Sequence, residues 1–218
     1  LVVFQFALSV IFIVSVLVIQ HQVEFVHNKN LGYDRDNIVY FETHGKIASS
    51  AELFLSEVKR IEGVANASSM LGNLIGLGRD TQGGGMPGVH SWGERQVPMN
   101  VAQVNYDMIE TLGIQIKSGR SFSRDHGGST TQCIYNEAAI EALGIEDPIG
   151  KILPGGAEIV GVARNFNFQS LHESVQPHCF ILAPDESSTV MVKIDKGMER
   201  QVITQLNRLY QSLNPGFE

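Results

Sequence analysis

The first 20 residues of the chain, LVVFQFALSVIFIVSVLVIQ, contain no charged side chain, and their polar residues before Gln20 are Gln5, Ser9 and Ser15. As a helix this segment would span roughly 30 Å, about the thickness of the hydrocarbon core of a bilayer. Apolar residues occupy every side of the helical wheel, which suits lipid on all sides, whereas a soluble core helix keeps a polar face. The basic n-region and the small-residue cleavage site of a signal peptide are not visible. We therefore predict a membrane-spanning helix, with membrane lipid around residues 1–20.

Helical spacing continues beyond this segment, because Ile19, Val23 and Val26 keep the period of a helix while the residues between them become polar. We predict a stalk of a few turns that ends at Leu31-Gly32-Tyr33, with Gly32 in the left-handed conformation. The sequence does not begin with Met, so we take it as an excerpt of a longer protein.

The chain is acidic, with a net charge of −7 over 218 residues, which argues against a nucleic-acid-binding surface. No run of Lys or Arg suggests a patch for anionic lipid. The two cysteines, Cys133 and Cys179, each lie in an apolar, strand-like run, where a free cysteine is usually a small core residue. The sequence alone leaves open whether they form a disulfide.

After the stalk the pattern predicts a strand at 37–42, a helix that begins at a capping box of Ser49 and Glu52 and stops at Gly63, and a strand at 64–70. The helix has one apolar face, formed by Ala51, Phe54, Leu55 and Val58. This order fits either a βαβ unit or the start of a split α/β sandwich.

The stretch from Gly72 to Glu94 has no periodicity and contains eight glycines, so we predict a long flexible loop of the kind that is usually functional or disordered. A strand at 96–104 follows it. Residues 105–114 and 136–145 resemble each other, and each is predicted to be a short helix with an Asn cap and a Gly stop.

The remaining predicted strands lie at 132–135, 158–163, 178–182 and 189–194, the last with clean alternation of apolar residues. A closing helix follows Asp195 and ends at Pro215-Gly216. Its apolar face is formed by Met198, Val202, Leu206, Leu209 and Leu213.

Motifs that carry chemistry do not emerge from the sequence. The segment Gly144–Lys151, GIEDPIGK, differs from a phosphate-binding P-loop in having five residues between its glycines and Ile152 after the lysine, so we predict a turn. There is no HExxH or GxSxG, and His172-Glu173 is the nearest approach to a metal or acid/base pair. Asn66-Ala67-Ser68 formally fits a glycosylation acceptor within a predicted strand. We therefore predict no catalytic, cofactor-binding or metal-binding residues.

Several segments in order along the chain resemble the MacB-like periplasmic core domain of FtsX-type ABC transporter permeases. After the apolar helix they are NKNLGYDRDNIVYF, VNYDMIETLGIQIKSGRSFS, YNEAAIEALG, DPIGKIL and IVGVARNFNFQSLHESVQPHCF. The resemblance implies an α+β fold with a transmembrane helix and stalk at 1–30. It further implies a two-lobed periplasmic domain, with a Porter-like α/β lobe at 31–71 plus 178–218 and an inserted Sabre-like lobe at 72–177.

The same resemblance implies a permease subunit of the bacterial inner membrane, with the residues after about 20 in the periplasm. Its expected partners are a cytoplasmic ABC ATPase subunit, a second permease in a homodimer, and a periplasmic adaptor or cargo. Such a subunit is not itself an enzyme, and it couples ATP hydrolysis by its partner to export or to mechanical work outside the cytoplasm. The alternatives are a membrane-anchored extracytoplasmic sensor or binding domain and a membrane-tethered enzyme. The sequence does not indicate a substrate.

Overall fold

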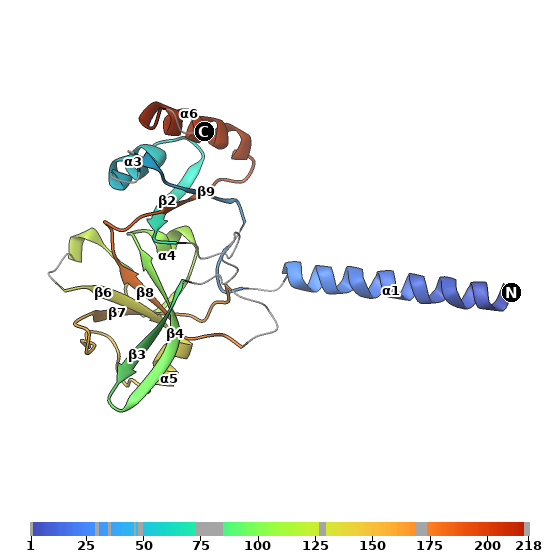
Figure 1. Cartoon of the computed structure of the whole chain (residues 1–218), viewed down its shortest axis with the longest axis horizontal. Coiled ribbons are helices and arrows are strands. Elements are labelled where there is room, and N and C mark those ends of the chain that lie inside the picture. The colour runs from blue at the N-terminus through green and yellow to red at the C-terminus, as the bar shows by residue number, and fades with distance from the viewer. Residues whose placement is uncertain are drawn as a thin grey trace. The chain divides into compact units, whose positions relative to one another are not determined.

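The computed structural model describes residues 2–28, 31–34, 36–45, 47, 50–72, 85–126, 130–168 and 174–215, with the side chains of 23–28 left undescribed. The chain divides into two compact units, residues 1–31 and residues 32–218. Figure 1 shows the first unit as one long helix and the second as a mixed α/β domain.

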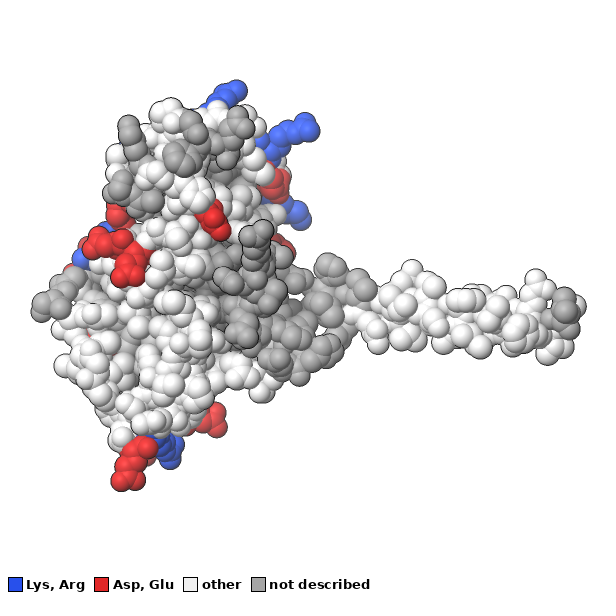
Figure 2. All heavy atoms as spheres, viewed as in Figure 1, with Lys and Arg blue, Asp and Glu red and all other residues white. Residues whose placement is uncertain are grey.

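The first unit consists of helix α1 (Val2–Asn28). Its segment Val2–Gln22 has a mean hydropathy of 2.9 and is long and apolar enough to cross a membrane. The space-filling view in Figure 2 shows no acidic or basic side chain along this segment. The helix continues past the apolar segment to Asn28, which confirms the predicted helical extension through Val26. Gly32, at a φ of 78°, has the expected left-handed conformation.

The second unit is built on a nine-stranded sheet with the order β1-β9-β2-β4-β8-β6-β7-β5, and β3 pairs with β4 beside this path. The strands are β1 (Ile38–Glu42), β2 (Val64–Met70), β3 (Met86–Trp92), β4 (Arg95–Val104), β5 (Ile116–Gly119), β6 (Gln132–Asn136), β7 (Glu158–Ala163), β8 (His178–Leu182) and β9 (Thr189–Ile194). The helices are α3 (Ala51–Val58), α4 (Met108–Thr111), the 3-10 helix η1 (Arg124–His126), α5 (Glu137–Leu143) and α6 (Glu199–Leu213).

Of the two arrangements open for β1, α3 and β2, the structure has the split one. Both strands pair antiparallel with β9, which lies between them. Helices α3 and α6 cover one face of these three strands, and their predicted apolar faces form the core there (Figure 1). The rings of Phe41, Phe54 and Tyr210 meet edge to face in this core, with centroids 5.9 to 6.3 Å apart. Edge-to-face pairs of aromatic rings stabilise a core beyond what the burial of their surface contributes.

Two further cores lie on the remaining strands. Helix α5 packs against residues of β4, β6, β7 and β8 that face one way, including Val97, Tyr135 and Ile159. Helix α4 packs into a core on the other face, which joins residues of β2 and β9 to residues of β4, β6, β7 and β8. This second core therefore ties the β1-β9-β2 strands to the rest of the sheet.

The prediction of a loop from Gly72 to Glu94 is wrong in its second part. Met86–Trp92 forms strand β3, which pairs antiparallel with β4 from Met86–Val101 to Trp92–Arg95. The glycine and proline residues of this strand interrupt the sequence pattern of a strand. Its extended conformation is stabilised by pairing with β4. The first part of the stretch, residues 73–84, lies outside the described residues. Strand β5, another edge strand, was also not predicted.

The two similar segments 105–114 and 136–145 differ in how their helices begin. Asn136 caps α5 as predicted, because its Oδ1 accepts a 3.0 Å hydrogen bond from Ala139 N. The predicted cap at Asn105 is wrong, since α4 follows Asp107, which has a φ of 66°. The capping box at α3 is also wrong, because the residue before the helix is Ser50, whose side chain makes no cap bond. Asn105 and Glu52 bind each other instead.

Candidate functional site

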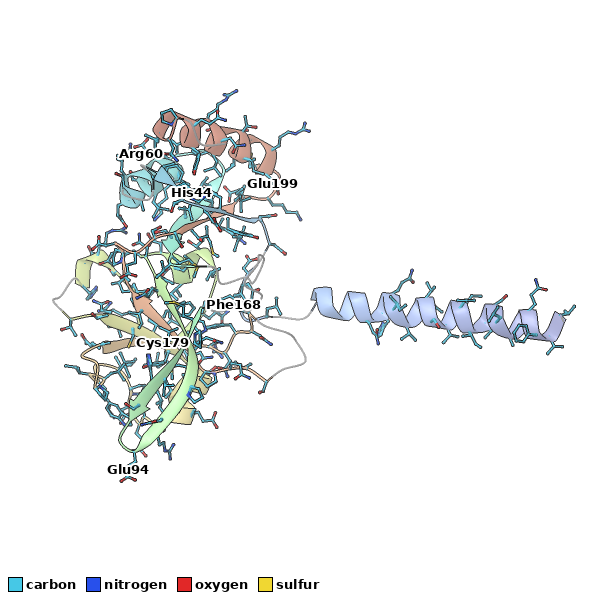
Figure 3. The ribbon with its side chains drawn as sticks, viewed as in Figure 1. His44, Arg60, Glu94, Phe168, Cys179 and Glu199 are labelled. Atoms are coloured by element: carbon cyan, nitrogen blue, oxygen red, sulfur yellow. The ribbon has the colours of Figure 1, made fainter. Side chains whose placement is uncertain are left out.

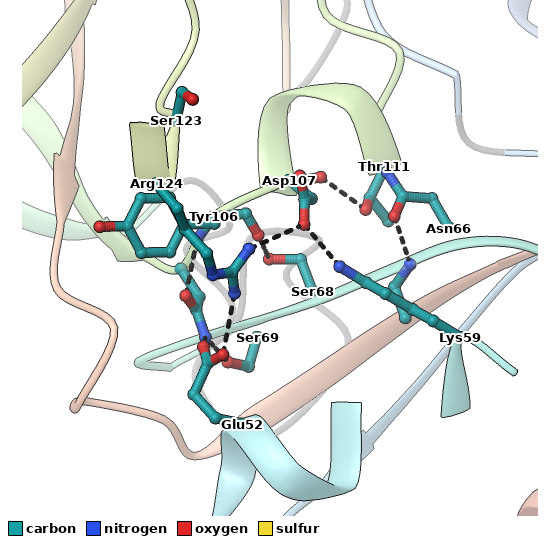
Figure 4. Close-up of polar contacts among 12 residues, drawn as sticks. Glu52, Lys59, Asn66, Ser68, Ser69, Tyr106, Asp107, Thr111, Ser123 and Arg124 are labelled. Carbon is teal, nitrogen blue, oxygen red and sulfur yellow. Dashed lines mark hydrogen bonds and ion pairs between the residues drawn. The ribbon is translucent and has the colours of Figure 1, made fainter. Parts of the chain in front are cut away.

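The strand pairing that joins β1-β9-β2 to the remaining strands is narrow, although a shared core also packs across it. Within the described residues, β2 and β4 share the single register pair Met70–Val104. Two backbone hydrogen bonds flank it, from Leu71 N to Gln103 O at 3.0 Å and from Asn105 N to Ser69 O at 2.8 Å. A set of polar side chains crosses between the two groups of strands beside this pair (Figure 4). We name this set the polar joint, and it comprises Glu52, Lys59, Ser68, Ser69, Asn105, Tyr106, Asp107 and Arg124.

Ion pairs form the outer part of the polar joint. Lys59, which follows the last residue of α3, places its Nζ 2.5 Å from Oδ2 of Asp107. Arg124 in η1 contacts two carboxylates. Its Nη2 lies 2.8 Å from Oε2 of Glu52, and its Nη1 lies 3.5 Å from Oδ2 of Asp107, the oxygen that also contacts Lys59. The guanidinium also lies over the ring of Tyr106, 4.4 Å from its centroid. Two cations and two carboxylates thus alternate across the joint.

Buried hydrogen bonds form its inner part. The side chain of Asn105, which is fully buried, donates to Glu52 Oε1 at 2.6 Å and to Ser69 Oγ at 3.2 Å. Its Oδ1 accepts a 2.7 Å bond from Tyr106 N. Ser68 is also fully buried, and its Oγ donates to Tyr106 O at 2.7 Å. Every one of these polar groups has a partner, which fixes a single arrangement of the joint.

The two parts of the joint differ in what they contribute. The side chains of Lys59 and Asp107 are 31% and 34% exposed, and those of Arg124 and Glu52 are about half exposed, so each pair is worth no more than about 1 kcal/mol. Loss of the Asn105 amide would leave buried donors and acceptors unpaired, at a cost of about 1–3 kcal/mol. The buried amide of Asn105 therefore fixes the geometry of the polar joint, and the ion pairs orient the parts that meet there.

Neither cysteine provides a reactive group. The structure has both Cys133 in β6 and Cys179 in β8 as free, fully buried thiols, and Figure 3 shows Cys179 among the strands. Burial raises the pKa of Cys179 well above its ordinary value. The neighbouring Tyr135 has its pKa raised by burial, and its hydroxyl contacts Nδ1 of His90, whose pKa burial lowers. The raised pKa keeps the Cys179 thiol protonated, and a protonated buried thiol is a poor nucleophile.

The other segments considered in the sequence do not form a reactive site. Gly144–Lys151 is a turn between α5 and β7, with Gly144 capping the helix at a φ of 65° and Gly150 N donating to Ile159 O. The potential glycosylation tripeptide lies in β2, where Ser68 is buried. His172-Glu173 lies outside the described residues. Among the residues that the structure describes, no cluster of three or more His, Cys, Asp or Glu side chains could hold a metal ion.

The polar joint was missed at the level of sequence. The sequence pattern predicts helix-capping roles for Glu52 and Asn105, which are usual for such residues beside a helical pattern. In the structure Glu52 binds Asn105 and Arg124, which are 53 and 72 residues away from it along the chain. The left-handed backbone at Asp107, after which α4 begins, is not visible in a sequence.

Comparison with solved structures shows that the chain shares its fold with two known extracytoplasmic regions. The extracellular domain of the noncanonic ABC-type transporter YknZ from Gram-positive bacteria superposes with a TM-score of 0.56 at 16% identity, over 84% of this chain and 96% of that one. The periplasmic region of MacB from Actinobacillus actinomycetemcomitans gives a TM-score of 0.55 at 16% identity, over 85% and 88% of the two chains. The α+β architecture implied by the MacB-like resemblance is thereby confirmed. No family model matches the chain, and no curated protein matches it.

Proposed function

We propose that this chain is the first membrane helix and the extracytoplasmic domain of an ABC transporter permease subunit, which transmits motion driven by a partner ATPase. The observation that carries the proposal is the combination of two features in one chain. A helix long and apolar enough to span a membrane precedes the domain, and the domain has the fold of the YknZ and MacB extracytoplasmic regions. In this proposal ATP hydrolysis belongs to a separate cytoplasmic subunit, and residues 1–218 contain no P-loop motif.

The proposal includes the two lobes, a Porter-like lobe at 31–71 plus 178–218 and an inserted Sabre-like lobe at 72–177. The core beneath α3 and α6 supports the first lobe, because that core is built from β1, β2, β9 and the two helices. Strand β8, at the boundary of the division, pairs with β4 and β6 of the inserted lobe. In this division the polar joint lies where the lobes meet. It takes Glu52 and Lys59 from the first lobe and Asn105, Asp107 and Arg124 from the second.

The joint gives the proposal a physical route for motion. A displacement applied to one lobe is passed to the other only if their contacts resist shear, and the buried bonds of Asn105 provide that resistance. The exposed pairs of Arg124 and Lys59 can exchange partners at small cost, which allows a limited change of angle. In the inner membrane, a homodimer of such subunits would present the lobes to a periplasmic adaptor or cargo.

Distance measurements between the lobes test this function. Leu53 on α3 and Val89 on β3 are 59% and 64% exposed, so both accept a spin label after replacement by Cys. Cys133 and Cys179 are fully buried, so neither competes with the introduced positions for the label. A pair on one lobe, Leu53 with Ile203 on α6, serves as the control because Ile203 is 41% exposed. The full permease is measured in membranes with its partner ATPase.

The proposal expects the Leu53–Val89 distance distribution to change during ATP hydrolysis while the Leu53–Ile203 distribution stays constant. A sensor or binding domain would respond to an extracytoplasmic ligand and not to ATP. An unchanged Leu53–Val89 distribution during active hydrolysis would therefore refute transmission through this domain.

A further inference from the structure

Residues 32–34 join the helical segment to β1, and they contact three separate parts of the domain. Gly32 lies against the backbone of Asn165 and Phe166, in the loop after β7. Asp34 N donates a 2.7 Å hydrogen bond to Leu112 O, just after α4. The carboxylate of Asp34 lies 2.6 Å from Nζ of Lys193 in β9. We name residues 32–34 the N-terminal clamp.

Gly32 is required by close approach as well as by backbone conformation. A Cβ at this position would lie 2.4 Å from Asn165 O and 2.8 Å from Phe166 Cα, both of which are backbone atoms. Its φ of 78° disfavours other residues independently. By contrast, Gly150 has a φ of 82°, and a Cβ added there would have no atom within 4 Å. Gly32 thus allows tight packing between two stretches of backbone.

An aromatic series continues this contact into the core. The ring of Tyr33 lies 4.5 Å from that of Phe168, centroid to centroid, and Phe168 lies 4.9 Å from Phe166. Phe166 in turn lies 5.4 Å from Phe180, which is fully buried in β8. Figure 3 labels Phe168, the ring in contact with Tyr33. The clamp is therefore packed against residues that continue to the centre of the sheet.

Asp34 fixes the clamp to β9 and to the turn after α4. Lys193 donates to Asp36 O at 2.5 Å as well as to the Asp34 carboxylate, and its side chain is only 18% exposed. The hydrogen bond from Lys193 holds the pKa of Asp34 below its usual value. A Cβ on Gly113 would lie 3.1 Å from Cβ of Asp34, so this turn also packs closely on the clamp.

We infer that the N-terminal clamp delivers displacement of the membrane helix to the loop 164–168 and to β9 at the same time. The inference rests on the proposed function. In the proposed division of the domain, the loop belongs to the inserted lobe and β9 to the Porter-like lobe. Gly32 is the positioning residue of the clamp, because it sets the distance between the incoming backbone and the loop. A flexible connection at residues 32–34 would pass less motion to either lobe.

The test compares Gly32→Ala with Gly150→Ala in the full permease with its ATPase. The two glycines have nearly equal φ, so the control imposes the same backbone strain without the contact. Gly32→Ala is expected to speed amide exchange at Asp34 by about tenfold or more, since its bond to Leu112 O must open more often. It is also expected to reduce the ATP-driven change in the Leu53–Val89 distance to less than about half, with ATP hydrolysis retained.

Lys193→Met is the second variant, because it keeps the stem of the side chain and removes only its bonds to Asp34 and Asp36. Lys193→Met should also speed amide exchange at Asp34 and reduce the ATP-driven change in the Leu53–Val89 distance, both to a smaller extent. It replaces Gly32→Ala as the test if that variant does not fold. If the rate of amide exchange at Asp34 in both variants equals that in the Gly150→Ala control, the clamp is overturned, whether or not the Leu53–Val89 distance changes. If the wild-type lobes do not respond to ATP, the proposed function fails, whereas faster exchange in the variants would still support the clamp.

Discussion

The amide of Asn105 donates a 2.6 Å hydrogen bond to the carboxylate of Glu52, across 53 residues of sequence and between the two groups of strands in the domain. Asn105 is fully buried, while Glu52 is half exposed and also accepts from Arg124. The pair therefore connects the interior of the polar joint to its surface ion pairs. A contact of this kind specifies how two packed bodies meet more than it adds to their stability.

Replacement of Asn105 by Ala should destabilise the domain by about 1–3 kcal/mol, because Tyr106 N and Ser69 Oγ lose a buried partner. Urea unfolding followed by circular dichroism measures this difference. Asn207→Ala on the exposed surface of α6 is the matched control and should change stability by less than about 0.5 kcal/mol. Equal stabilities of the two variants would show that the joint does not depend on the buried amide.

Acid should destabilise the domain through His178. Its ring is fully buried against Phe166 and Phe180, and in the described part of the chain its Nε2 has no hydrogen-bond partner. Burial lowers its pKa from 6.5 to about 3. Below pH 6.5 the unfolded chain binds a proton that the folded chain does not, so stability falls by up to about 1.4 kcal/mol per pH unit until about pH 3.

The variant His178→Phe isolates this effect, because an aromatic ring replaces the imidazole and removes the unpartnered Nε2. Between pH 6.5 and 5 the wild type should lose about 2 kcal/mol relative to the variant. This window lies above the range in which carboxylates such as Asp34, whose pKa Lys193 lowers, begin to contribute. Parallel pH profiles of the two proteins would contradict the assignment.

Local patterns were sufficient for much of the fold. Strands β2, β7, β8 and β9 have the bounds that alternation and apolar runs predict, because consecutive residues in each are buried and so both faces of the strand are covered. Strand β3 escaped detection because Pro87 and Gly88 obscure its alternation, and its pairing with β4 stabilises it. The polar joint could not be predicted, since Asn105 and Glu52 come together only when α4 packs on β2.

Residues 32–218 should fold without α1. This unit contains all three apolar cores and every strand of the sheet, whereas the described apolar side chains of α1 are exposed. The isolated unit is expected to be soluble, to unfold cooperatively, and to show no saturable binding of ATP. Calorimetry and nucleotide titration measure both properties. Aggregation with correct secondary-structure content would move the boundary of the domain, and saturable ATP binding would refute the assignment of hydrolysis to another subunit.

A break in the helix before the domain should uncouple it from the membrane. Helix α1 continues without interruption to Asn28, well past the apolar segment that ends at Gln22. Substitution of His27 by Gly and Asn28 by Pro removes backbone hydrogen bonding there, at a cost of several kcal/mol to local helicity. A flexible joint absorbs displacement, so the ATP-driven change in the distance between the lobes should fall. The movement of cargo or the activation of a partner should fall with it.

The domain should still fold, since its cores do not include this segment. ATP hydrolysis by the partner should continue. The double substitution His27→Ala and Asn28→Ala is the control, because it changes the same side chains and preserves the helix. Full activity in the Gly-Pro variant, with the break verified by structure, would show that the domain acts as a passive binding platform.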